Sequence, residues 1–89
     1  MPTIHLLISG KVQGVFYRAS AKELANQLKL TGWIKNTREG DVEIMVSGEQ
    51  EQLDKFTRWC EEGPDEANVE EVIVTNKDEA TFNGFTIIR

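Results

Sequence analysis

The order of hydrophobic patterns along this 89-residue chain predicts an α+β fold, with two helices on one face of an antiparallel sheet. Two stretches have the 3.6-residue apolar period of amphipathic helices, and stretches typical of strands lie before, between and after them. The resulting order is strand, helix, strand, strand, helix, strand, with one further strand at the end. This is the order of the split βαβ, or ferredoxin-like, sandwich.

The first strand is predicted over residues 3–9, where apolar and polar residues alternate. The inward-facing residues of this strand are Ile4, Leu6 and Ile8. From about Arg18 the period changes to that of a helix, which runs to about Leu30. Its start is ambiguous, because Ser20 and Glu23 form a capping-box pattern that would begin the helix two residues after Arg18.

Residues 33–37 and 42–47 read as two strands joined by a tight turn, which is the pattern of a hairpin. A second capping box, Ser47 with Gln50, precedes a helix that ends at Gly63-Pro64. The apolar residues of that helix are Leu53, Phe56 and Cys60. The remaining strands are predicted over residues 69–75 and 85–89.

Length and charge limit the classes of function. A chain of 89 residues suits a single domain spanning residues 1–89, for which a monomer is the simplest expectation. Ten Lys and Arg against fifteen Asp and Glu give a net charge of -5, which opposes binding to nucleic acid. The sequence shows no membrane-spanning apolar run, secretory signal or cysteine pair, so we expect a soluble cytoplasmic protein with no membrane partner.

The loop from Gly10 to Arg18 predicts a binding site for a phosphate-sized anion. Glycine permits unusual dihedral angles and close approach of the backbone, so several N–H groups can converge on one ligand. The start of the following helix adds unpaired N–H groups and the positive end of its dipole. Arg18 adds a permanent charge whose planar fork matches phosphate or carboxylate oxygens.

Asn36 is the polar residue that the predicted topology can bring near this loop. It lies on the same side of its strand as Ile34. The pattern alone leaves two interpretations open, a solvated residue at the end of a strand or a residue of the site.

Two segments of the chain closely resemble the signature segments of the acylphosphatases. These segments are GKVQGVFYR at residues 10–18 and GWIKNTREG at residues 32–40. Tyr17 stands where many members have phenylalanine, which preserves an aromatic ring, and Lys35 and Arg38 occupy positions that the pattern leaves variable. The resemblance in length and element order extends over essentially the whole chain.

The resemblance implies hydrolysis of the carboxyl–phosphate bond of an acyl phosphate, with inorganic phosphate as a product and without a metal or cofactor. Arg18 matches the family's phosphate-binding arginine, and Asn36 matches the asparagine that orients the attacking water. Backbone amides would complete the phosphate cradle, from Gln13, Gly14, Val15, Phe16, Tyr17 and Arg18. The side-chain amide of Gln13 can also bond to the loop backbone and hold the shape of the cradle.

Two other functions remain open from the sequence. The same cradle could belong to a non-catalytic module that binds phosphate or an acyl phosphate, although a mere anion site would not need Asn36. A small RNA-binding domain would require basic and aromatic residues on the open sheet face, which has little positive charge here. His5 is interpreted as a surface histidine, Cys60 as a core residue, and both tryptophans as packing residues.

Overall fold

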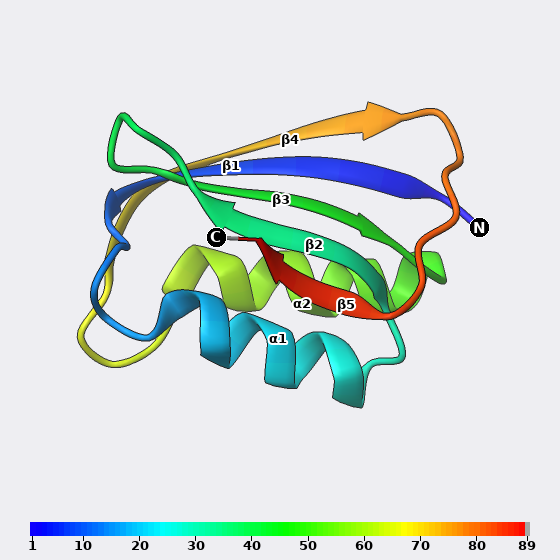
Figure 1. The fold of residues 1–89 in the computed structure, drawn as a ribbon, viewed down its shortest axis with the longest axis horizontal. Coiled ribbons are helices and arrows are strands. Elements are labelled where there is room, and N and C mark those ends of the chain that lie inside the picture. The colour runs from blue at the N-terminus through cyan, green and yellow to red at the C-terminus, as the bar shows by residue number, and fades with distance from the viewer. Residues whose placement is uncertain (89) are drawn as a thin grey trace.

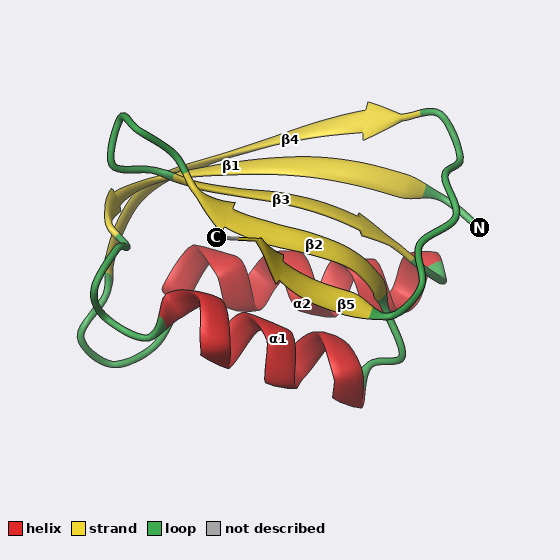
Figure 2. Ribbon diagram, in the orientation of Figure 1, coloured by secondary structure: helices red, strands yellow, loops and turns green. Residues whose placement is uncertain are grey.

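The computed structural model of the chain describes residues 1–88, which form one sheet with two helices packed on one face (Figure 1). The elements in chain order are β1 (Thr3–Lys11), α1 (Tyr17–Gln27), β2 (Thr31–Asn36), β3 (Val42–Ser47), α2 (Gln50–Glu62), β4 (Asn68–Lys77) and β5 (Phe85–Ile88). The strands lie in the order β4-β1-β3-β2-β5. Figure 2 shows both helices on the same side of this sheet, while the other side has no helix. The predicted α+β architecture is therefore confirmed.

The core lies between the sheet and the helices. The inward residues of β1, which are Ile4, Leu6 and Ile8, are 5%, 0% and 0% exposed, as the alternation predicted. Helix α2 contributes three fully buried side chains, Leu53, Phe56 and Cys60. Removal of these apolar side chains from water is the main favourable term that holds the helices on the sheet.

The sheet is mixed rather than antiparallel, because its last strand pairs in the parallel direction. Strand β1 pairs antiparallel with both β3 and β4, and β2 pairs antiparallel with β3. Strand β5, in contrast, runs parallel to β2. The chain leaves β4 at one edge of the sheet and crosses to the opposite edge before β5 begins. Phe85 is 5% exposed and packs against Phe56, which anchors β5 over the core.

Neither predicted capping box forms. Helix α1 begins at Tyr17 after Phe16, so Ser20 lies inside the helix rather than at its cap. Helix α2 begins after Glu49, and the Ser47 hydroxyl instead donates to the Pro2 carbonyl at 3.2 Å. Neither N-cap residue, Phe16 or Glu49, makes a side-chain capping bond.

Helix α1 also ends earlier than its apolar pattern suggests, at Gln27 rather than about Leu30. Lys29 adopts a left-handed conformation with φ 58°. Its N–H donates to the Asn26 carbonyl at 3.2 Å, and the N–H of Leu30 donates to the Ala25 carbonyl at 2.8 Å. This pair of bonds is a Schellman motif, which stops the helix and directs Leu30 into the core.

Candidate active site

A pocket of about 310 Å³ lies where the loop after β1, the end of β2 and strand β5 meet. In Figure 1 the β1–α1 loop lies at the same end of the molecule as the β2–β3 turn. The pocket is lined by Val12, Gly14, Phe16, Tyr17, Arg18, Ala19, Asn36 and Ile87. Arg18 and Asn36 come from the two separate signature segments, and the fold brings them to the same cavity.

The loop presents a run of backbone amides that have no protein partner among residues 1–88. The first backbone N–H after this run that donates a hydrogen bond is that of Ser20, whose acceptor is the Phe16 carbonyl at 3.0 Å. No backbone N–H from Gln13 to Ala19 donates a hydrogen bond within the described residues. These N–H groups include those of the first turn of α1, where a helix attracts anions.

Two left-handed residues shape this run of amides. Gly14 has φ 74°, and Phe16 has φ 64° and ψ 23°. Left-handed residues within a turn direct successive N–H groups toward one concave site, which is a common way to bind an anion. A Cβ added at Gly14 would meet no atom within 4 Å, so the space next to this residue is open for a ligand.

Arg18 is the cation of the pocket. It lies in the first turn of α1, is half-buried, and forms no ion pair with a carboxylate of residues 1–88. A guanidinium in this state keeps its donors for a ligand, and its fork can hold two oxygens of a phosphate at once.

Asn36 ends β2 and faces the same cavity. Its Oδ1 is buried and has no hydrogen-bond partner among the described residues. A buried carbonyl oxygen without a partner costs free energy, because it loses its bonds to water and gains none in return. The acceptor capacity of this oxygen is therefore unused among residues 1–88.

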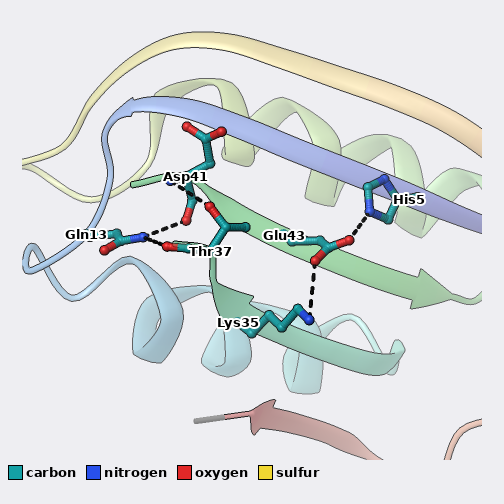
Figure 3. A network of polar contacts seen from close by, with 6 residues as sticks. All are labelled: His5, Gln13, Lys35, Thr37, Asp41 and Glu43. Atoms are coloured by element: carbon teal, nitrogen blue, oxygen red, sulfur yellow. Dashed lines mark hydrogen bonds and ion pairs between the residues drawn. The ribbon is translucent and has the colours of Figure 1, made fainter. Parts of the chain in front are cut away.

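Gln13 connects the loop to the hairpin that carries Asn36 (Figure 3). Its Nε2 donates to the carbonyl of Thr37 at 2.9 Å and to the carbonyl of Asp41 at 2.8 Å. The Thr37 hydroxyl in turn accepts from the backbone N–H of Asp41 at 3.1 Å. The predicted bond from Gln13 to its own loop is therefore replaced by bonds to the β2–β3 turn, which join both signature segments.

Some predicted loop residues have side chains that are held by the core or by the hairpin. The side chain of Val15 is buried in the core, while Gln13 points to the hairpin. Tyr17 is 1% exposed, and its hydroxyl donates to the Cys60 carbonyl at 2.7 Å. Burial raises the pKa of Tyr17, so this phenol keeps its proton and supports the base of the pocket.

Ile87 is a pocket residue that the sequence did not identify. It lies on β5 opposite Ile34 of β2 in the parallel register. Nothing in the sequence indicates which strand β5 joins, so no pattern could have placed Ile87 beside Arg18.

The remaining candidates lie away from the pocket. His5 bonds to Glu43 at 2.7 Å on the open sheet face, and Lys35 approaches the other oxygen of Glu43 at 3.6 Å (Figure 3). The hydrogen bond to His5 is the largest cause of the lowered pKa of Glu43. Cys60 is fully buried, which confirms a core residue, and this burial raises the pKa of its thiol to about 12.

The described residues contain no cluster of three or more His, Cys, Asp or Glu side chains arranged to hold a metal ion. Among these same residues, no helix is both long and apolar enough to cross a membrane.

Comparison with known proteins agrees with this geometry. The acylphosphatase family matches residues 4–87. An acylphosphatase of Marinobacter nauticus is 56% identical over 68 residues, which cover 76% of this chain and 74% of the relative. One from Methylococcus capsulatus is 40% identical over 94 residues and covers 100% of this chain and 98% of the relative.

A solved structure gives the same result. The crystal structure of acylphosphatase from Bacillus subtilis has a TM-score of 0.96 and 30% identity, with 100% of both chains covered. The chain belongs to the acylphosphatase family, and its activity is the hydrolysis of acyl phosphates.

Proposed function

We propose that Arg18 and the amides of the β1–α1 loop bind the phosphoryl group of the acyl phosphate, while Asn36 positions the water that attacks it. The buried, unpartnered Oδ1 of Asn36 beside the cradle is the observation that carries this proposal. An anion-binding module would need only Arg18 and the amides. Hydrolysis also requires a group that holds the attacking water, and the unpartnered Oδ1 of Asn36 can accept a hydrogen bond from it.

The chemistry requires few groups from the protein. Water oxygen forms a bond to phosphorus while the bond from phosphorus to the carboxyl oxygen breaks, and the carboxylate leaves with the bonding electron pair. The conjugate acid of that leaving group has a pKa of roughly 4, so it needs no proton from a general acid. The proton of the attacking water passes to a phosphate oxygen of the substrate. No metal or cofactor has a role in this scheme.

Charge and position then account for catalysis. The phosphoryl oxygens carry negative charge in the transition state, and preorganised N–H groups with a guanidinium stabilise that charge. Asn36 holds the water near phosphorus so that the attack requires little further ordering. The side-chain amide fixes the direction of the water by accepting a hydrogen bond from it, without acting as a base.

The test compares two variants in the release of phosphate from benzoyl phosphate. Arg18→Ala should weaken both inhibition by inorganic phosphate and turnover, because it removes the charge that holds the phosphoryl group. Asn36→Ala should lower kcat by about 100-fold or more while the inhibition constant of phosphate changes little. Near-normal kcat in Asn36→Ala would show that the assigned role is wrong.

Matched controls separate the site from general effects of losing these residue types. Arg58 and Asn76 are exposed and do not line the pocket, so Arg58→Ala and Asn76→Ala should keep normal turnover. The reaction should also proceed unchanged in the presence of a chelator. Loss of phosphate release with chelator would contradict the metal-free scheme.

The setting of this reaction also forms part of the proposal. We propose a monomeric, single-domain enzyme of the cytoplasm that has no nucleic-acid or membrane partner. The net charge of -5 supports the absence of a nucleic-acid partner, because it opposes binding to a polyanion. Sedimentation of the purified chain tests the monomer directly, and a dimer at micromolar concentration would overturn that part of the proposal.

A further inference from the structure

The proposed roles leave one part of the pocket lining without a function. Arg18, Asn36 and the loop amides are occupied by the phosphoryl group and the water. Among the other lining residues, Val12 and Tyr17 are each 1% exposed and offer little surface. The accessible remainder is apolar and consists of Phe16, Ala19 and Ile87.

Phe16 has two features that folding alone does not favour. Its side chain is 78% exposed, although a phenyl ring is a large apolar group. Its backbone has φ 64°, which is an unusual conformation for a bulky residue. Such strain is concentrated at functional sites, where it places a side chain for binding. Phe16 precedes Arg18 by two residues and lines the same cavity.

Ile87 supplies the second apolar surface from a different element. It is half-buried, rests on the core, and lines the cavity from β5. Phe16 and Ile87, which we call the acyl wall, thus contribute carbon surface from the start of α1 and from the edge of the sheet.

We infer that the acyl wall binds the acyl group of the substrate and selects aromatic or bulky aliphatic acyl phosphates over small ones. This inference rests on the proposed function, because the acyl group can meet the wall only when its phosphoryl group lies in the cradle. Contact with Phe16 and Ile87 removes apolar surface of the substrate from water, which is the source of the preference.

Charge supports the same selection. Arg18 is the only charged side chain among the described lining residues, and the phosphoryl group uses it. A neighbouring hollow next to Asn36 has both cations and anions in its lining, namely Lys35, Arg38, Glu39 and Glu43. The acyl wall itself carries no charge, so a second negative group on the acyl end would gain no ion pair from Phe16 or Ile87.

The test measures binding of two non-hydrolysable phosphonates, benzoylphosphonate and acetylphosphonate, by calorimetry. The unsubstituted chain should bind benzoylphosphonate about tenfold more tightly, as expected when one ligand fills an apolar site that the other leaves empty. Phe16→Asn should reduce this ratio toward one, because asparagine tolerates a positive φ but has no apolar ring. Ile87→Ala should reduce it by a smaller factor.

The control is Ile73→Thr, which removes an exposed apolar residue of β4 far from the pocket lining and should preserve the ratio. Equal affinity of the unsubstituted chain for both phosphonates would overturn the inference, and so would an unchanged ratio in both Phe16→Asn and Ile87→Ala. Failure of the proposed function would be recognised by a different result. In that case the chain would bind benzoylphosphonate selectively but would release no phosphate from benzoyl phosphate.

Discussion

At the scale of single residues, Gln13 links the two halves of the candidate site. Its side-chain nitrogen donates to two carbonyls of the β2–β3 turn at 2.9 and 2.8 Å. One of these carbonyls belongs to Thr37, the residue after Asn36. We therefore propose that Gln13 is a positioning residue that sets the separation between the loop amides and Asn36.

Gln13→Glu tests this positioning role. A carboxylate cannot donate to two carbonyl oxygens and is repelled by them, so the loop and the hairpin should move apart. We expect kcat for benzoyl phosphate to fall by about tenfold or more, since small displacements in a site have large kinetic costs. The inhibition constant of inorganic phosphate should rise by a smaller factor, because the new carboxylate repels the anion while Arg18 and the loop amides still bind it.

Gln50→Glu is the matched control, since Gln50 donates to Asp54 at 2.9 Å on the exposed surface of α2. It should keep the kcat of the unsubstituted chain. If Gln13→Glu lowers only the melting temperature and leaves kcat unchanged, the residue is structural and does not position Asn36.

At the scale of elements, the structure shows which boundaries the sequence could predict. Apolar periods placed both helices and all the strands, because burial of one face dominates their stability. The change of period near Arg18 placed the start of α1 to within one residue, but the capping-box patterns were misleading, because Phe16 and Glu49 are N-cap residues without side-chain capping bonds. The partner of β5 was also unpredictable from the sequence, since a short apolar strand can pair with either edge of a sheet.

The candidate site likewise combines residues that the sequence could identify with residues that only the tertiary structure reveals. The motifs brought attention to Arg18 and Asn36, and the fold places both in one pocket. Gln13 was recognised as a residue that shapes the loop, but its partners lie across the hairpin and depend on tertiary structure. Ile87 had no sequence signal, because its place in the site depends on the parallel pairing of β5 with β2.

The end of α1 gives an element-scale prediction. Lys29 has φ 58° in the Schellman motif, which a residue with a Cβ adopts at a cost. Lys29→Gly should raise the free energy of unfolding by about 0.5 to 1 kcal/mol, after allowance for the greater freedom of glycine in the unfolded chain. Urea unfolding followed by tryptophan fluorescence measures this change.

The same substitution inside the helix has the opposite sign. Lys22 is exposed in the middle of α1, and Lys22→Gly should lower the free energy of unfolding by about 1 kcal/mol. If Lys29→Gly and Lys22→Gly destabilise the protein equally, the left-handed end of α1 is absent in solution.

At the scale of the whole molecule, the pocket exists only when three distant parts of the chain are folded together. It joins the β1–α1 loop, the end of β2 and strand β5. Unfolding of any of these parts removes the site, so phosphate should bind the folded state alone. A ligand of this kind stabilises a protein in proportion to the logarithm of its concentration.

Inorganic phosphate should therefore raise the free energy of unfolding, by about 2.7 kcal/mol at a concentration of 100 Kd. The measurement is urea unfolding in phosphate against chloride at equal ionic strength. Arg18→Ala should lose most of this stabilisation, whereas Arg58→Ala, on the exposed surface of α2, should retain it. Equal stabilisation of both variants would show that phosphate acts as a general salt.

The pairing of β1 with β4 has a consequence for the speed of folding. Thr3 lies opposite Lys77, so strands near opposite ends of the described chain are direct neighbours in the sheet. Their pairing closes a loop that contains both helices and the hairpin. The chain loses this conformational entropy before the hydrogen bonds between β1 and β4 can offset it. The transition state therefore depends on non-local contacts, and the chain should fold more slowly than a helical bundle of equal length.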